Sequence, residues 1–392
     1  EAVVDLAGAT ISVKAPSAED IESGDAVKTG SFSFTGYTPG GTLVSATLFA
    51  GIVTTKDISA EVANSYIVSE PETNYLIDAT RKSDGSLLAT SYVDVVWQTA
   101  SGFVQYADFE DGKASFYIGA DSDDATKIKQ GNAVIGAYNA DDELIWSWHI
   151  WVTEYDPSQP AGQQTVGGNV FMDRNLGATS LVKGPQSAGC FYQWGRKDPF
   201  QGPYTWMMFL NANAGWSNDG IGKFMTLKGL ASTKVPSENL VASVQQPYRY
   251  IVGISGTQDW LSPDVGGEAY RWSNADGTKG VFDPCPEGWR VPVSGAGAAS
   301  AWADLNGVWD AERTGCVFAE GNGYYPAAGY INIMSASGSG GGAEAGTSGY
   351  CWSASSAGRN GYALTYSVSA IKTEAELTKA WACPVRCVKD VK

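Results

Sequence analysis

The sequence predicts a mainly β protein that begins with a β-sandwich region, and two observations carry this prediction. Aromatic residues make up 12% of the 392 residues, and 14 Trp and 19 Tyr stand beside 47 Gly. Stiff rings favour strands and glycine favours turns. Short β-branched and aromatic runs, separated by Gly, Asp, Asn and Pro at roughly regular spacing, also fill the chain before Glu154. These runs are GSFSFTGY, TLVSATLFAGIV, TSYVDVVWQT, KASFYIGA, GNAVIGAYN and LIWSWHIWV.

The last two of these runs predict a β-hairpin. In GNAVIGAYNADDELIWSWHIWV, two apolar arms flank the polar segment NADDE. Asn and Asp favour turns because their side chains hydrogen bond to nearby backbone.

A change in charge and in cysteine content along the sequence predicts two main regions. Residues 1–167 hold 24 acidic against 8 basic residues, whereas residues 168–392 hold 18 of each and all six cysteines. The segment EYDPSQPAGQQTVGG, rich in Pro and Gly, coincides with this change. We therefore expect an acidic β-sandwich region over residues 1–157, of one or two units with a possible split near residue 98. A linker over 158–168 and a second domain over 169–392 follow.

Charge and hydropathy restrict the partners and the location. The net charge of −16 lies wholly in the first region, and an acidic surface repels phosphate backbones and anionic headgroups. Nucleic acid and bare membrane are therefore poor partners. The sequence has no apolar run long enough for a transmembrane segment, and no basic-then-apolar signal opens it. The chain is expected to be either cytosolic or exported with its signal removed.

The cysteines favour the exported alternative. An even number confined to one domain is typical of a disulfide framework in an oxidising compartment. In an extended strand the Cα atoms of Cys383 and Cys387 would lie about 13 Å apart, too far for one bridge. These two are therefore expected to have different partners, and structural zinc is disfavoured because paired CxxC spacings are missing.

Few residues have the pattern of a catalytic or metal site. His149 is the only histidine and lies in a run of bulky rings, which favours a structural role over a triad or zinc site. Asp121, Asp123 and Asp124 lack the EF-hand pattern and are interpreted as a solvated turn. Gly338 to Gly346 lacks the ending of a phosphate loop. Paired carboxylates for glycoside hydrolysis stay open, because 42 acidic residues offer many pairs.

The second region reads as loop-rich. Long stretches without alternation run from 201 to 280 and from 335 to 349, and the first carries several tryptophans. One short helix is expected at AASAWADLNGVW, ended by Gly307.

Six segments of this region together resemble the Fibrobacter succinogenes major paralogous domain of Bacteroidetes surface proteins, over about residues 168 to 389. They are VFMDRNLGATS, GCFYQWGRKDPF, FDPCPEGWRVPV, YYPAAGY, GYCWSAS and CPVRCVKD. The segment WSWHIWVTEYDP ahead of them is also similar to such proteins, where a sandwich precedes the domain. The resemblance implies a C-type-lectin-like fold with a small twisted sheet, one or two helices and a long loop region.

The fold class predicted is therefore mainly β, an immunoglobulin or transthyretin-like β-sandwich region followed by an α+β C-type-lectin-like domain. The resemblance also implies that Cys285 and Cys387 pair, so DPCPEGWRVP is interpreted as a covalent staple. Four further cysteines depart from the family pattern. Cys351 with Cys383 is the preferred second bridge, since both are expected on strands near the end of the domain, and Cys190 with Cys316 follows by elimination.

The resemblance implies a cell-surface adhesin or fimbria-associated protein, lipid-anchored in many relatives, that binds a glycan or host protein. The predicted ligand residues are aromatic and polar residues of the loop region, because flat rings stack on sugar faces and amides or carboxylates bind hydroxyls. They are Tyr204, Trp206, Trp216, Asn218, Asp219, Trp260 and Trp272. No cofactor is expected; calcium stays open, although the sugar-binding motifs of true C-type lectins are not intact.

Two alternatives stay open. A structural fimbrial subunit or tip adaptor would bind sister subunits by strand addition and no glycan. A polysaccharide-acting surface enzyme is disfavoured by the single histidine and the lack of a nucleophile-base pair, so no enzymatic activity is expected. The expected location is extracellular, at the outer-membrane surface, with a signal or lipoprotein peptide removed.

Overall fold

The computed structural model describes most of the chain, and all statements below concern the described residues. These are residues 2–5, 10–13, 29–37, 43–51, 54–99, 103–200, 228–254, 259–261, 270–295, 297–303, 305–318, 323–333 and 342–391. The fold is mainly β, as the sequence predicts. No helix among these residues has the length and apolar character needed to cross a bilayer.

The first described strands form two antiparallel pairs. β1 (Ala2–Asp5) pairs with β2 (Thr10–Val13), and β3 (Thr29–Tyr37) pairs with β4 (Leu43–Gly51). The predicted runs GSFSFTGY and TLVSATLFAGIV thus fall on paired strands. None of these four strands pairs with a later strand.

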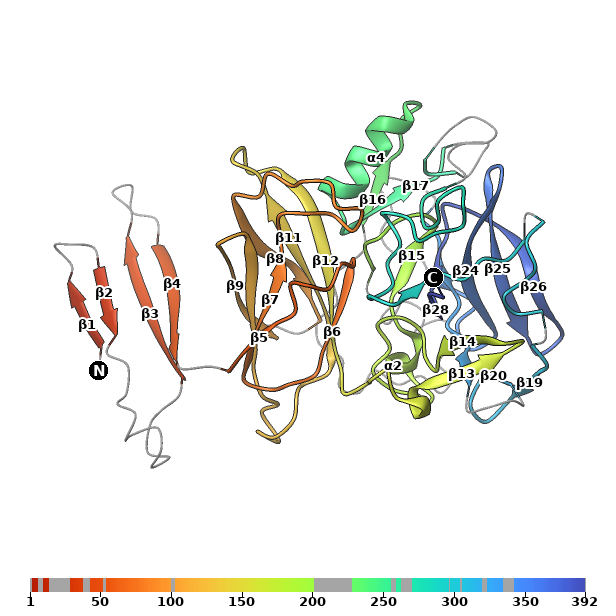
Figure 1. Cartoon of the computed structure of the whole chain (residues 1–392), viewed down its shortest axis with the longest axis horizontal. Helices are drawn as coiled ribbons and strands as arrows, with labels where there is room; N and C mark the ends of the chain where they lie inside the picture. The colour runs from red at the N-terminus through yellow and green to blue at the C-terminus, as the bar shows by residue number, and fades with distance from the viewer. Residues whose placement is uncertain are drawn as a thin grey trace.

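Residues 54–153 form a domain of two four-stranded sheets, here called the two-sheet domain (Figure 1). The sheet orders are β5-β7-β10-β9 and β6-β12-β11-β8. Tyr75, Phe116, Ile135 and Trp148 belong to the core that the two sheets share. The strands are β5 (Thr54–Asp57), β6 (Ser65–Val68), β7 (Thr73–Asp78), β8 (Tyr92–Gln98), β9 (Val104–Glu110), β10 (Lys113–Ile118), β11 (Gly131–Tyr138) and β12 (Leu144–Val152).

The predicted hairpin is confirmed, but the predicted split near residue 98 is wrong. β11 and β12 pair antiparallel, and the polar turn closes through the Asn139 amide, which donates to the Glu143 carbonyl at 3.0 Å. β8 ends at Gln98, yet it pairs with β11, so the strands before and after this point complete the same domain. The break in strand pairing lies between Gly51 and Thr54 instead. β3 and β4, before it, pair only with each other, and β5, after it, pairs with β7 of the two-sheet domain.

The predicted linker at 158–168 is also wrong, because this segment belongs to the following domain. It contains the 3₁₀ turn η1 (Pro160–Gly162) and β13 (Gln163–Val166), which pairs with β14 (Asn169–Met172). Gly167 and Gly168 both have positive φ, as a tight hairpin between these strands requires. Pro and Gly therefore mark a turn and a hairpin here.

Residues 154–391 form the C-terminal domain, whose described part is built from small sheets and two short helices. The sheets are β13-β14-β28-β18, β15-β27-β22-β23, β16-β17, β19-β20-β21 and β24-β25-β26. The helices are α2 (Pro185–Ala188) and α4 (Pro236–Gln245). The remaining strands are β15 (Phe191–Gln193), β16 (Lys228–Ala231), β17 (Arg249–Val252), β18 (Trp289–Arg290), β19 (Gly307–Asp310), β20 (Gly315–Phe318), β21 (Tyr324–Pro326), β22 (Tyr330–Ile331), β23 (Gly342–Ala343), β24 (Ser348–Ala357), β25 (Asn360–Ser367), β26 (Ile371–Thr378), β27 (Ala382–Pro384) and β28 (Val388–Lys389).

The helix expected in AASAWADLNGVW is replaced by a turn and a strand. Residues 301–303 form the turn, and Gly307 opens β19 instead of ending a helix. Trp302 packs against Phe171 in the core, which fixes this segment through one side chain. The longest described helix, α4, lies inside the stretch read as irregular. Its start carries ordinary signals, since Pro236 occupies the first turn with Glu238.

One disulfide is present among the described residues, and it is the pair that the resemblance implies. Cys285 and Cys387 are joined, with Cα atoms 6.0 Å apart and a sequence separation of 102 residues. Asp283 fastens the same segment, because its carboxylate accepts hydrogen bonds from the Cys285 and Val291 amides at 2.8 Å each. DPCPEGWRVP is therefore a staple.

The two further bridges predicted from the sequence are wrong. Cys190, Cys316, Cys351 and Cys383 are free and buried. Each proposed pair is divided between two hydrophobic clusters, since Cys190 and Cys383 pack in one and Cys316 and Cys351 in the other. Burial raises the pKa of all four thiols, to about 11 for Cys316 and Cys351. These thiols act as small apolar side chains.

A buried polar joint connects the two-sheet domain to the C-terminal domain. The Asn64 amide donates to the carbonyls of Val281 and Asp283, and Ser65 Oγ donates to the Pro284 carbonyl at 2.5 Å. The acceptors all lie in the segment that the disulfide holds. The Asn132 amide donates to the Gly177 carbonyl at 2.9 Å.

His149 lies at the centre of this joint and is fully buried. Its Nε2 lies 2.8 Å from Asn132 Oδ1 and its Nδ1 lies 3.1 Å from Ser65 Oγ. The Asn132 oxygen can only accept, so Nε2 carries the proton. Burial lowers the pKa of His149 to about 3, which keeps the ring neutral.

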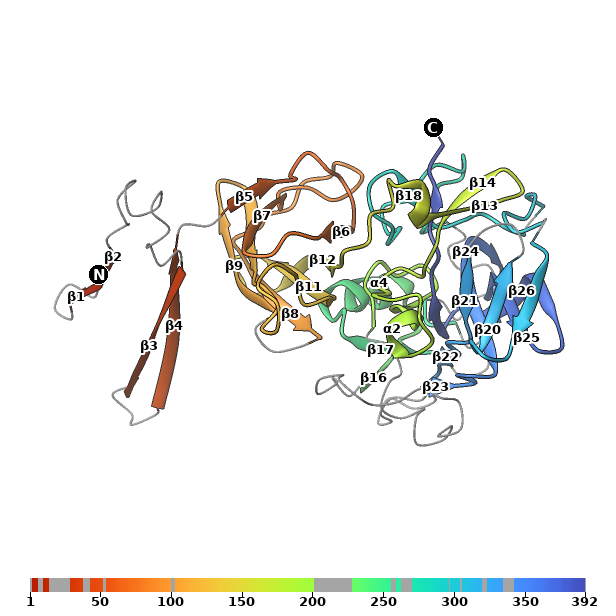
Figure 2. The ribbon, with the colours of Figure 1, turned by 90° about the horizontal axis from the view of Figure 1, so that it is seen from below.

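The segment LIWSWHIWV forms β12 and is buried along nearly its whole length, because side chains on both of its faces pack against a core. Trp146, Trp148 and Ile150 point into the two-sheet core, whereas Trp151 belongs to a core cluster of the C-terminal domain. On that second face Ser147 meets a buried ion pair. Lys197 Nζ contacts Asp198 Oδ1 at 2.7 Å and donates to the Ser147 carbonyl at 2.8 Å. One strand thus serves both domains, and it lies between them in both views (Figures 1 and 2).

Candidate functional site

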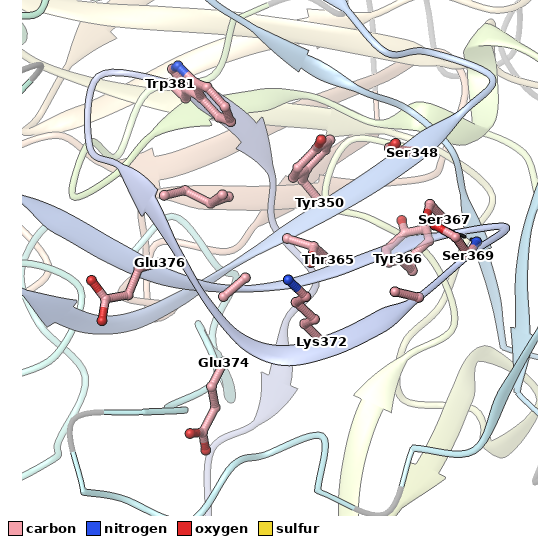
Figure 3. A pocket seen from close by; sticks show the side chains of 13 residues that line it. Ser348, Tyr350, Thr365, Tyr366, Ser367, Ser369, Lys372, Glu374, Glu376 and Trp381 are labelled. Carbon is pink, nitrogen blue, oxygen red and sulfur yellow. Dashed lines mark hydrogen bonds between the residues drawn. The ribbon is translucent and has the colours of Figure 1, made fainter.

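The three-stranded sheet β24-β25-β26 carries an open groove of about 690 Å³. We call it the β26 groove. Its lining is mixed, with hydroxyl, charged and aromatic side chains (Figure 3). The lining residues are Ser348, Tyr350, Thr365, Tyr366, Ser367, Ser369, Ala370, Lys372, Glu374, Ala375, Glu376, Leu377 and Trp381.

Strand register aligns the polar residues of the groove in rows. Tyr350 on β24 lies opposite Thr365 on β25, and Thr365 lies opposite Lys372 on β26. Ser348 and Ser367 form a second pair beside the first row. Directly opposed residues project from the same face of a sheet, so the phenol, the hydroxyl and the ammonium share one face.

An aromatic wall borders this row at the β24 end. Trp381 follows β26 and stacks on Tyr330, with ring centroids 3.9 Å apart and an interplanar angle of 11°. Tyr350 meets both rings edge-on, at 5.3 Å and 6.3 Å. Trp381 and Tyr330 are only partly buried, so the wall combines rigid packing with accessible ring surface.

Tyr350 is oriented by a carboxylate. Its hydroxyl donates to Glu344 Oε2 at 2.5 Å. Burial and this hydrogen bond raise the pKa of Tyr350, so the phenol stays protonated. Glu344 thereby fixes the ring that joins the aromatic wall to the row of hydroxyls.

Of the residues predicted from the sequence as ligand contacts, the two that the structure describes, Trp260 and Trp272, do not line this groove. Tyr204, Trp206, Trp216, Asn218 and Asp219 lie outside the described residues. Trp260 and Trp272 are 0% and 1% exposed. Their indole N–H groups donate to the carbonyls of Trp194 and Arg196, so both rings are core and unavailable for stacking on a ligand. The prediction is therefore wrong for Trp260 and Trp272.

No metal site stands out among the described residues, where no group of three or more His, Cys, Asp or Glu side chains converges. Asp121 and Asp124 instead accept from nearby backbone amides at Asp123 and Thr126, at 3.0 Å each, as in solvated turns.

The sequence reasoning missed the groove because its residues come from separate segments. Tyr330, Tyr350 and Trp381 lie on or beside three different strands. The available signal was the alternation of IKTEAELT, in which Lys372, Glu374 and Glu376 are exposed and the residues between them are partly buried. That pattern identifies a strand with exposed charged side chains, but not its neighbours.

Comparison with protein family models, with curated proteins and with solved structures gave no match in any of the three. The family resemblance and the lectin-like and immunoglobulin-like or transthyretin-like folds therefore stay predictions from the sequence.

Proposed function

We propose that this chain is a cell-surface adhesin that binds a saccharide in the β26 groove. The observation that carries the proposal is the accessible Trp381–Tyr330 stack beside a row of hydroxyl and ammonium groups. Sugar rings present an apolar C–H face and a rim of hydroxyls. An aromatic plane next to hydrogen-bonding groups complements both.

The covalent staple supports a location outside the cytosol. Disulfides form and persist in oxidising compartments, and the Cys285–Cys387 bridge closes a long loop at the joint. The four free thiols fit the same location because they are buried and held in the protonated state, which protects them from oxidation.

The alternative of a structural subunit that polymerises by strand addition gains less support at this sheet. β26 is an edge strand, and its exposed side chains Lys372, Glu374 and Glu376 are all charged. Charged side chains on an edge strand oppose pairing with another strand. The groove is thus better suited to a soluble ligand than to a donated strand.

A glycan array with the full chain tests the proposal. The array carries neutral and acidic oligosaccharides, with calcium and with a chelator, and compares the native protein with Trp381→Ala and Tyr92→Ala. Tyr92 is the matched control, because it is an exposed ring stacked on Tyr138 in the two-sheet domain. We expect binding that Trp381→Ala weakens at least 10-fold and Tyr92→Ala leaves unchanged.

Two results would count against the proposal. Binding that survives Trp381→Ala would move the site away from the groove. A complete lack of saccharide binding, with concentration-dependent assembly of the chain, would favour the structural subunit.

A further inference from the structure

Lys372 gives the β26 groove a charge that its ligand has to match. It is exposed, lines the groove and forms no hydrogen bond or ion pair with any described residue. Figure 3 shows its side chain directed toward Thr365. An ammonium held beside hydroxyls, with no internal anion, is available to a bound ligand.

The neighbouring acids do not neutralise this position. Glu374 and Glu376 are on the same strand, but both point away from Tyr350 and Trp381 (Figure 3). Glu376 Oε2 accepts from the Asn360 amide at 3.2 Å, which holds it across the neighbouring strand. At the Tyr350 end of the row, the Glu344 carboxylate is engaged by the Tyr350 hydroxyl.

The register sets the distance between the aromatic wall and the charge. Tyr350 and Lys372 occupy the first and third strands of one row, so two strand spacings separate their backbones, about 10 Å. Each strand spacing is comparable to one sugar unit of an extended oligosaccharide. A ring that stacks on Trp381 therefore places a following sugar unit near the ammonium of Lys372.

We propose that the ligand is an acidic oligosaccharide, with one sugar on the Trp381–Tyr330 wall and the anionic group of a following sugar paired to Lys372. This inference rests on the proposed function and adds the ligand class to it. The anion is a carboxylate or a sulfate, since an ammonium acts as a point charge toward both. Thr365, between the two ends, donates to or accepts from the connecting sugar.

Two matched pairs of probes test the inference on the full chain by isothermal titration calorimetry. The first is tetragalacturonate and its neutral methyl ester. The second is a sulfated carrageenan tetrasaccharide and its desulfated counterpart. The protein variants are Lys372→Gln and the control Lys129→Gln, which makes the same charge change at an exposed lysine of the two-sheet domain.

We expect at least one acidic probe to bind more tightly than its neutral partner. Lys372→Gln should remove that preference, at a loss of about 5-fold in affinity for the acidic probe, the size typical of an exposed charge-assisted hydrogen bond. Lys129→Gln should change neither probe. The pair that shows the preference identifies the anion.

The failures are distinguishable. Equal binding of acidic and neutral probes, still lost in Trp381→Ala, would refute the acidic ligand and leave the saccharide site standing. A preference for acid that persists in Lys372→Gln would refute the assignment of Lys372. No binding of any probe or array saccharide would refute both proposals.

Discussion

The joint and the β26 groove are both built from polar side chains, yet they use them in opposite ways. In the joint, Asn64, Ser65 and Lys197 direct their donors at acceptors of the other domain and are buried with them. In the groove, Lys372 is exposed and has no partner among the described residues. Buried polar groups that lose a partner cost stability, whereas exposed ones are free to bind. Substitutions in the joint should therefore lower the free energy of unfolding, whereas substitutions in the groove should weaken ligand binding.

The largest loss of stability is expected from opening the staple behind the joint. Cys285→Ser with Cys387→Ser releases a loop of about 100 residues, which costs about 4 to 5 kcal/mol in the chain-entropy model. Calorimetric unfolding without reductant measures the loss, and reductant should not affect the variant further. A loss below about 1 kcal/mol would mean that the joint holds this segment without the bridge.

A loss of about 3 kcal/mol is expected from Asp198→Asn. The change leaves the Lys197 ammonium buried beside Ser147 without its anion, and an uncompensated buried charge is costly. Burial already lowers the pKa of Lys197, and removing Asp198 should lower it further. Urea unfolding measures the loss. Glu374→Gln is the control on the groove edge and should change stability by less than about 0.5 kcal/mol.

The pH dependence of the joint depends on two groups with opposite effects. The folded pKa of His149 is about 3, below its ordinary 6.5, so its contribution to stability is present above pH 6.5 and is lost as pH falls toward 3. Burial raises the pKa of Asp283 from 3.8 to about 6, so its contribution is present below pH 3.8 and is lost as pH rises through 6.

His149→Gln removes the first effect and keeps the second. From pH 6 to pH 4, the stability advantage of the native protein over this variant should shrink by about 1.4 kcal/mol per pH unit. Urea unfolding at several pH values across this range measures the difference. Parallel pH profiles for the two proteins would show that His149 is not the group responsible.

The smallest effect on stability is expected from the groove itself. Trp381→Ala removes a partly buried ring stacked on Tyr330, and such a pair contributes about 1 kcal/mol. The same change should weaken saccharide binding at least 10-fold, so its effect on binding should be large and its effect on stability small. A loss of stability as large as that of Asp198→Asn would show that Trp381 is a core residue, and the contrast between the regions would disappear.

Local patterns predicted those parts of the fold that local chemistry determines. The turn NADDE fixed the β11–β12 hairpin because Asn139 and Glu143 bond across four residues. Predictions from composition were wrong where the same residue types occur in more than one kind of structure. The Pro and Gly of 158–168 read as a linker, yet they form a turn and a hairpin. Ala and Trp around residue 300 read as a helix, but Trp302 is held by a tertiary contact.

The candidate site was less predictable than the fold. A tryptophan carries no local mark of whether it lies in a core or on a surface, so Trp260 and Trp272 could not be told from Trp381. The groove exists only once β24, β25 and β26 are paired and Tyr330 is brought in from another sheet. Such convergence is set by long-range register, which the one-dimensional pattern does not contain.

Because β12 contributes side chains to both cores, a force applied to the two-sheet domain would pass into the C-terminal domain through packed side chains. Cutting the chain after Val152 would leave β12 on the N-terminal fragment and separate Trp151 and Ser147 from their partners in the C-terminal domain, so the two pieces are expected to need each other to stay soluble.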